Sequence, residues 1–196
     1  MTTEKVIDAK TIFTEGRTYN GWLDKPVSPE LLTELYHLLS LAPTSANSNP
    51  ARFVFIESAT MKRVVAACAD EMNRPKIMGA PITVVVASDT EFYEHYATLF
   101  PARPEAGMLF KSDAELARDT MERNTVLAGG YFILAARALG LDCGPMSGFS
   151  RAKLDEELFP DGRWKSNFLC NIGYGDPASL WPRNPRLDFD TACRVV

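Results

Sequence analysis

The sequence predicts a single domain of the α+β class, in which helices surround a small sheet. Helical and strand-like segments mix along the 196 residues without a regular βαβ alternation. Neither a G-x-G-x-x-G turn after a strand nor a G-x-x-x-x-G-K-[ST] loop occurs. The length suits one domain, residues 1–196, with a substantial core. These observations disfavour a doubly wound nucleotide-binding sheet and favour α+β.

The first helix is predicted in SPELLTELYHLLSLAP. Ser28 is a suitable N-cap, Pro29 stands at the first helical position, and Pro43 stops the helix. One face of this segment is apolar, with Leu31, Leu35, Leu38 and Leu39. A second helix is expected through ATMKRVVAACADEM.

Three segments read as strands: RFVFIES, the valine-rich PITVVVAS and KSNFLCNIGYG. Between the second and third, residues 112–140 predict one long helix that ends at Gly140 as a left-handed cap. Its second half, TVLAGGYFILAARALG, is apolar nearly all round, which indicates that it is covered on all sides and favours a subunit interface. The last segment, DPASLWPRNPRLDFDTACRVV, predicts an extended tail with little to bury against in its own subunit.

Composition excludes several classes. A net charge of −4 offers no basic surface for nucleic acid or for an anionic membrane. No apolar run is long enough for a membrane span, and MTTEKVIDAKTIF lacks the apolar core of a secretory signal. The four cysteines are scattered, without metal-ligand spacing. We therefore expect a cytoplasmic protein without a metal site.

Hydrolytic chemistry has little support. His37 lies in a leucine-rich helix, where a structural role is favoured, and His95 lies in EFYEHYATLF, which either lines a pocket or packs. No serine stands in a G-x-S-x-G elbow. The neighbouring aromatics form either a lid or part of the core: Phe92, Tyr93, Tyr96, Phe100 and Phe110.

Positive charges in unusual surroundings are the better candidates. Arg17 lies in EGRTYNGW, Lys76 in MNRPKIMGAP, and Arg183 and Arg186 in WPRNPRL. An arginine held by glycine or proline is preorganised, and its fork suits phosphate oxygens. Together with the polar stretch APTSANSNP, these residues predict a dispersed site for a phosphorylated ligand.

Several motifs occur here in the order that is typical of one family: RTYNGW, APTSANSNPARFVF, NRPKIMGAPITVVVA, ALGLDCGPMSGF, NIGYGD and PRNPRL. From about Thr11 to its C-terminus the chain resembles the FMN-dependent nitroreductases, and within them the RutE/HadB subgroup. The resemblance implies a small, mostly antiparallel sheet flanked by helices in an intertwined homodimer. It also implies two FMN molecules at the interface and a C-terminal arm, about residues 180–196, that wraps around the partner.

The resemblance also implies roles for individual residues. Arg17, with Thr18 in place of the usual serine, would contact the FMN phosphate, as would Arg183 and Arg186. Asn20 stands where many members have Arg or Lys near the flavin N1/O2 edge, so Lys76 would carry more of the stabilisation of reduced flavin. Other expected contacts are Asn73 near the ribityl and pyrimidine portion, Ser147, the Gly148 N–H at N5, and, from the other subunit, Pro43, Thr44, Ser45 and Asn47.

The implied activity is hydride transfer from NADH or NADPH to flavin N5 and then to an acceptor, with no protein nucleophile. The subgroup implies malonic semialdehyde as the acceptor, reduced to 3-hydroxypropanoate in pyrimidine catabolism. Two alternatives stay open. One is a broad NAD(P)H reductase of nitroaromatics or quinones, and the other is a flavin-binding protein without turnover. Arg52, Arg103 and Arg123 are candidates for a substrate carboxylate by charge alone.

Overall fold

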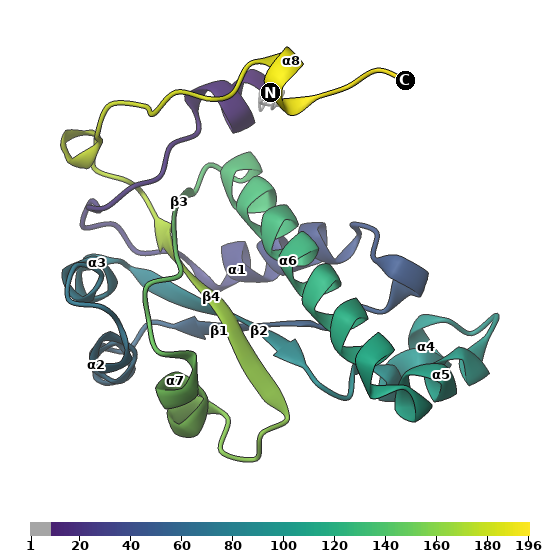
Figure 1. The fold of residues 1–196 in the computed structure, drawn as a ribbon. Coiled ribbons are helices and arrows are strands. Elements are labelled where there is room, and N and C mark those ends of the chain that lie inside the picture. The colour runs from purple at the N-terminus through teal and green to yellow at the C-terminus, as the bar shows by residue number, and fades with distance from the viewer. Residues whose placement is uncertain (1–8) are drawn as a thin grey trace, which may run out of the picture.

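A computed structural model describes residues 9–196; the start of the segment for which we expected no secretory signal lies outside them. The chain forms four strands among helices (Figure 1). The strands are β1 (Ala51–Ile56), β2 (Ile82–Asp89), β3 (Asp142–Met146) and β4 (Trp164–Gly173). The α-helices are α1 (Pro29–Ser40), α2 (Ala59–Cys68), α3 (Arg74–Gly79), α4 (Tyr96–Leu99), α5 (Gly107–Ser112), α6 (Ala114–Ala138), α7 (Arg151–Leu158) and α8 (Phe189–Ala192).

The four strands form one antiparallel sheet in the order β1-β2-β4-β3. Every residue of β2 is buried, because this central strand is covered on both faces. Its side chains alternate: Val84 packs with α1 and α6 residues, and Val85 packs with α2 and α7 residues. The sheet confirms the predicted α+β class and the antiparallel arrangement implied by the resemblance.

Strand β3 was quoted only as part of a motif and was not predicted as a strand. Gly144 and Pro145 weaken the strand pattern of DCGPM. The strand forms nevertheless because it lies at the edge of the sheet and pairs only with β4. An edge strand tolerates a proline, since one side of its backbone needs no partner within the sheet.

The predicted boundaries of the helices hold closely, with one exception. Ser28 caps α1 by accepting a hydrogen bond from the Leu31 N–H, as expected. The expected second helix, however, ends at Cys68 rather than near Met72. Ala69 is extended and pairs with Phe149, so tertiary contacts draw this stretch away from helical geometry. The remainder becomes a loop and α3.

Helix α6 is the long helix expected between residues 112 and 140. Asp113 caps its first turn, and Gly140 follows its end with a φ of +79°. One face packs on the sheet through Phe132 and Ala136. The other face leaves apolar side chains exposed in a single subunit: Leu116, Val126 and Leu127. The described chain therefore covers α6 on one side only.

The aromatic residues of the segment after β2 form part of the core in this structure. Phe92 and Tyr96 are fully buried and pack with Ala117 of α6. The remaining aromatics gather around them: Tyr93, Phe100 and Phe110. Residues 92–112 thus carry a small core of their own.

The N-terminal segment and the C-terminal tail run side by side at one end of α6 (Figure 1). Residues 181–196 are exposed throughout, including Trp181, Leu187 and Phe189. The tail is extended as predicted, apart from a 3-10 turn at Pro177–Ser179 and the short helix α8. In the described part of the chain, no helix has both the length and the hydrophobicity of a membrane-spanning segment.

Candidate functional site

The arginine cluster, defined here as Arg17, Arg137 and Arg183, surrounds the turn at residues 12–17. Arg17 donates through Nη2 to the Trp181 carbonyl of the tail. Arg183 donates back through Nη2 to the carbonyls of Thr14 (2.8 Å) and Gly16 (3.0 Å). This exchange binds the N-terminal segment and the tail to each other and brings two of the predicted phosphate ligands together.

Thr18 and Asn20 continue from this cluster along β3. Thr18 pairs with Cys143, and the Tyr19 N–H donates to the Cys143 carbonyl at 3.0 Å. Within the described residues, the predicted ligand Arg186 makes no hydrogen bond to the N-terminal segment; its Nη1 donates to the carbonyls of its neighbours Asn184 and Pro185. Among the ion pairs of the described residues, none involves an arginine of the cluster.

Gly148 lies against the loop between α2 and α3. Its carbonyl accepts two hydrogen bonds, from the Asp70 N–H (3.0 Å) and from Asn73 Nδ2 (3.0 Å). A Cβ at this position would lie 2.6 Å from Asp70 Oδ2 and 2.7 Å from Asn73 Nδ2. The present positions of these two side chains are therefore compatible only with glycine, and the two hydrogen bonds fix the peptide after Gly148. Ser147, just before it, is exposed.

Lys76 lies on α3, three residues after Asn73 and half-buried. Its carbonyl accepts from Asn171 Nδ2 of β4 at 2.9 Å, and Asn171 Oδ1 accepts from Thr83 Oγ1 at 2.7 Å. The buried Asn171 therefore ties the backbone of Lys76 to the sheet. Sequence reasoning missed Asn171 and Asp70; the only signal was a polar residue inside the apolar run FLCNIG.

The 43–49 loop, residues 43–49, is strained and heavily bonded within its own subunit. Ala46, Asn47 and Asn49 have φ values of 48°, 50° and 40°, a region that costs non-glycine residues about 1–2 kcal/mol each. Three contacts hold the loop: Asn124 Oδ1 accepts from the Ser45 N–H, Thr44 Oγ1 accepts from the Asn49 N–H, and Asn47 Nδ2 donates to the Leu99 carbonyl. Pro43, Ser45 and Asn47 stay exposed.

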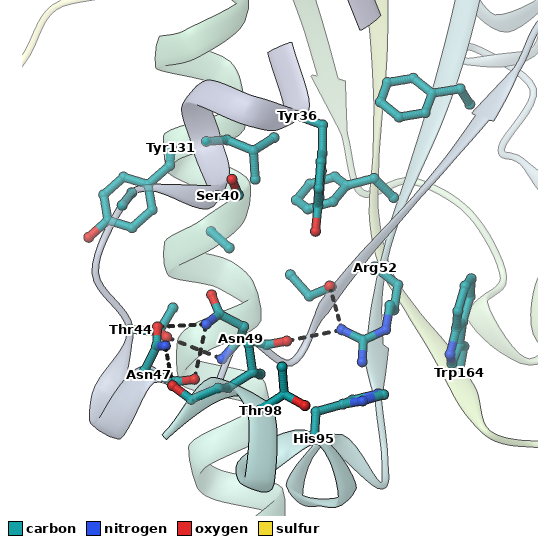
Figure 2. Close-up of a pocket in the computed structure, with 17 residues that line it drawn as sticks. Tyr36, Ser40, Thr44, Asn47, Asn49, Arg52, His95, Thr98, Tyr131 and Trp164 are labelled. Carbon is teal, nitrogen blue, oxygen red and sulfur yellow. Dashed lines mark hydrogen bonds between the residues drawn. The ribbon is translucent and has the colours of Figure 1, made fainter. Parts of the chain in front are cut away.

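This loop borders a cavity of about 810 Å³ between α1, β1, α6 and the segment of His95–Leu99. Figure 2 shows Thr44, Asn47 and Asn49 on one wall and Arg52, His95 and Trp164 on another. Tyr36 and Tyr131 add aromatic surface. Cavities that bind small molecules combine such aromatic walls with a few polar groups.

Asp89, at the end of β2, organises the polar wall of the cavity. Its buried carboxylate accepts from Arg52 Nη2 (2.5 Å) and Arg163 Nε (2.7 Å), and His95 Nε2 lies 3.7 Å away. Burial alone would raise the pKa of Asp89, but the hydrogen bonds from Arg163 and the Glu91 N–H and the charge of Arg52 together lower it. Arg52, a candidate for a substrate carboxylate, is thus engaged internally.

The sheet order separates the predicted site residues into two groups. Residues 17–20 and Gly148 adjoin β3, Asn73 bonds to Gly148, and Lys76 is tied to β4, whereas the 43–49 loop leads into β1. Strands β3 and β1 are the opposite edges of the sheet, about 14 Å apart across three strand spacings. Along α6, Asn124 and Arg137 are about 20 Å apart. One subunit therefore does not bring both groups to the same place.

The molecule is thus an α+β protein whose candidate site residues lie at two edges of one antiparallel sheet. Similarity to known proteins identifies its family. The family model described as the nitroreductase family matches residues 17–174. The chain is 55% identical over 185 residues, 94% of each chain, to a protein of Rhodopseudomonas palustris (strain TIE-1). It is 50% identical over 185 residues to one of Ralstonia nicotianae, again with 94% of each chain covered. Both relatives carry the provisional name NADH dehydrogenase/NAD(P)H nitroreductase. This chain belongs to the nitroreductase family.

Solved structures show the same fold. A provisionally described nitroreductase of Exiguobacterium sibiricum, crystallised in complex with FMN, has a TM-score of 0.85 at 23% identity, with 100% of both chains covered. One of Bacillus subtilis has a TM-score of 0.83 at 22% identity, with 94% of this chain and 97% of the other covered. The nitroreductase-like fold implied by the sequence motifs is confirmed.

Proposed function

We propose that this protein is an FMN-dependent NAD(P)H oxidoreductase that works as a homodimer. The observation that carries this proposal is the division of the candidate site between opposite sheet edges, because such a site is complete only where two chains meet. The cofactors FMN and NAD(P)H are supported by the names of the relatives and by the FMN-bound neighbour.

The residues present fit the two ends of FMN. Guanidinium groups without a carboxylate partner suit the phosphate, whose oxygens they bind in a fork. At Gly148 a Cβ would clash with Asp70 and Asn73, so only a residue without a side chain lets the loop that carries Asn73 lie this close to the backbone beside which the ring would bind. The residues that would hold FMN are Arg17, Thr18, Asn20, Asn73, Lys76, Ser147, Gly148, Arg183 and Arg186 of one chain, and Pro43, Thr44, Ser45 and Asn47 of its partner.

FMN, when bound, would supply the redox chemistry between NAD(P)H and the acceptor, for which we propose a ping-pong sequence through flavin N5. The chain itself positions and stabilises. The Gly148 N–H would donate toward N5. The two hydrogen bonds to the Gly148 carbonyl hold the next peptide and so restrict the backbone on the C-terminal side of this N–H. The Lys76 ammonium would offset the negative charge that develops on the ring edge, and Asn20 can add only a neutral hydrogen bond there.

The dimer would use surfaces that one subunit leaves uncovered. Val126 and Leu127 of α6 are 55% and 42% exposed, and Trp181 and Phe189 of the tail are 69% and 65% exposed. Apolar patches of this kind indicate a protein interface. Residues of about 180–196 would form the arm that wraps around the partner, with residues 1–196 as one domain. The free thiols Cys68, Cys143, Cys170 and Cys193 are compatible with a cytoplasmic location.

The subgroup motifs GLDCGPMSGF and KSNFLCNIGYGD favour malonic semialdehyde as the acceptor, reduced to 3-hydroxypropanoate in pyrimidine catabolism. The names of the relatives favour a second candidate, a broad reductase of nitroaromatics or quinones. Arg52 lines the cavity but is bonded to Asp89, so it does not mark a site for a substrate carboxylate. Kinetic measurements therefore decide between the two acceptors.

The absorption spectrum of the purified protein tests the proposal first. A flavin spectrum that bleaches on anaerobic addition of NAD(P)H and returns with an acceptor is expected. A spectrum that persists with NAD(P)H would instead indicate a flavin-binding protein without turnover, and failure to take up FMN at all would refute the proposal. Steady-state rates with malonic semialdehyde, another small aldehyde, a quinone and a nitroaromatic then decide the acceptor. A semialdehyde rate no higher than that of the other aldehyde would refute the semialdehyde assignment.

A further inference from the structure

We propose that Arg137 is a positioning residue for the phosphate end of the site: it holds the turn that carries Arg17, so that the Arg17 guanidinium and the Thr18 hydroxyl face the FMN phosphate. This inference rests on the proposed function and adds a residue that neither the motifs nor the comparisons assign.

Arg137 joins the most rigid element of the subunit to the turn. It lies in the last turn of α6, and its two terminal nitrogens donate to different carbonyls of the N-terminal segment. Nη1 donates to Ile12 (3.1 Å) and Nη2 donates to Arg17 (3.2 Å). One planar guanidinium therefore spans the turn from its first residue to its last and fixes the direction in which the chain leaves it.

Gly16 makes this contact possible. A Cβ on Gly16 would lie 2.9 Å from both Cζ and Nε of Arg137 and 2.4 Å from the Ile12 carbonyl oxygen. The guanidinium therefore lies directly against the backbone of the turn. Its Nε is buried without a hydrogen-bond partner among the described residues, so its two Nη bonds account for its hold on the chain.

The charges around the turn point to an anion. Arg137 and Arg183 donate hydrogen bonds to carbonyls of residues 12–17, and Arg17 donates one to the Trp181 carbonyl. Backbone carbonyls are neutral, so these contacts leave the three positive charges uncompensated. Glu15 of the turn pairs with Lys10 at 3.8 Å, and the Asp142 carboxylate accepts from the Gly175 N–H at 2.9 Å. Among the described residues, neither acid forms an ion pair with Arg17, Arg137 or Arg183. Like charges held this close repel one another, and a phosphate dianion would offset that repulsion.

Arg137 is better placed than Arg183 to hold the turn in the free subunit. Arg183 belongs to the exposed tail, whereas α6 packs on the sheet through Phe132 and Ala136. The C-terminal end of a helix also favours a cation, because the helix dipole is negative there. Loss of Arg137 would leave the turn attached chiefly to the tail, and Arg17 would lose its fixed direction.

The test compares FMN with riboflavin, which has the same ring and lacks the phosphate. The full-length chain is freed of flavin, and the dissociation constants of both compounds are measured by quenching of flavin fluorescence. Because charge-assisted hydrogen bonds contribute about 1.5–3 kcal/mol, Arg137→Gln should weaken FMN binding about 10- to 100-fold and leave riboflavin binding nearly unchanged. The double variant Arg17→Gln/Arg137→Gln should lose less FMN affinity than the two single losses added together, because Arg137 acts largely through Arg17.

Arg151→Gln is the matched control, since Arg151 also donates to a backbone carbonyl, that of Ser166, but lies on α7. It should leave the ratio of FMN to riboflavin affinity unchanged. If Arg137→Gln fails to fold, Arg137→Lys keeps the charge and loses the two-carbonyl span, and it should lower the same ratio.

The remaining outcomes distinguish failure of the proposed function from failure of the positioning role. A wild-type chain that binds no FMN refutes the proposed function itself. A wild-type chain that prefers FMN, with an Arg137 variant whose preference is unchanged or whose affinity for both compounds falls equally, overturns the positioning role. Additive losses in the double variant would overturn the claim that Arg137 acts through Arg17.

Discussion

The substitution Gly148→Ala separates the stability of the fold from its proposed chemistry. A methyl group here would lie 2.6 Å from Asp70 Oδ2 and 2.7 Å from Asn73 Nδ2, where ordinary contacts begin at 3.4 Å. Each neighbour would have to move by about 0.7–0.8 Å. Both clashing atoms are side-chain ends, so they can rotate away, and Gly148 needs no positive φ. The cost is therefore the loss of the Asn73 hydrogen bond, about 0.5–1.5 kcal/mol.

That loss is nearly offset by the smaller unfolded-state entropy of alanine, about 0.4–1 kcal/mol. We expect the free energy of unfolding to change by less than about 1 kcal/mol. The Gly148 carbonyl, however, loses one of its two anchors, so the backbone at Gly148 is freer to turn and the N–H on the preceding peptide is held less firmly toward the flavin. Because such a hydrogen bond contributes about 1 kcal/mol or more, hydride transfer to the flavin should slow about 10-fold.

Urea unfolding measures the first quantity, and anaerobic stopped-flow bleaching by NAD(P)H measures the second. Gly79→Ala is the control, since a Cβ there meets nothing within 4 Å, and it should leave both quantities near wild type. A Gly148→Ala protein that is reduced at the wild-type rate would refute the role given to this peptide. One destabilised by about 3 kcal/mol or more would show that the side chains cannot rotate away as described.

Three further outcomes are expected. Lys76→Ala should slow flavin reduction more than it weakens FMN binding, because the charge that it offsets exists only after the hydride arrives; equal losses in stopped-flow rate and affinity would make Lys76 a binding residue only. Asp89→Asn should destabilise the fold by about 3 kcal/mol at neutral pH, since it removes a buried partner of Arg52 and Arg163. The pKa of Asp89 is lowered in the folded chain, so its contribution to stability is present above the unfolded pKa of about 3.9 and is lost as the pH falls through the folded value. Urea titrations should therefore show the free energies of unfolding of the wild type and of Asp89→Asn converging as the pH is lowered. A difference between the two proteins that does not change with pH contradicts the assignment. Val126→Asp should convert a dimer into monomers in light scattering, whereas Met61→Asp on α2 should not, since only Val126 lies on the uncovered face of α6.

Local signals in the sequence predicted much of the architecture. Valine-rich β2 needs no context to be recognised, because its continuous apolar run fits only a strand covered on both faces. The caps Ser28 and Gly140 marked helix ends because their preferences arise within one turn of the backbone. The end of α2 at Cys68 was not readable, because Ala69 becomes extended through pairing with the distant Phe149.

The candidate site divides in the same way. Arg17 and Arg183 could be singled out by their glycine and proline neighbours, and the structure brings them together across the N-terminal segment and the tail. Arg137 could not be, because an arginine at the end of an apolar helix has an ordinary appearance in sequence. Its importance depends on the carbonyls that it reaches, more than 100 residues away along the chain.

The sequence by itself determined the α+β class, the main strands and helices, the resemblance to the nitroreductases and the residue types suited to a phosphorylated flavin. Only the tertiary structure decided that these residues lie at opposite edges of one sheet, and that buried Asn171 and Asp89 and half-buried Arg137 support the candidate site and its neighbouring cavity. The reason is physical. Propensity, capping and periodicity act over a few residues, whereas strand order and the partner of a buried polar group depend on contacts between distant segments.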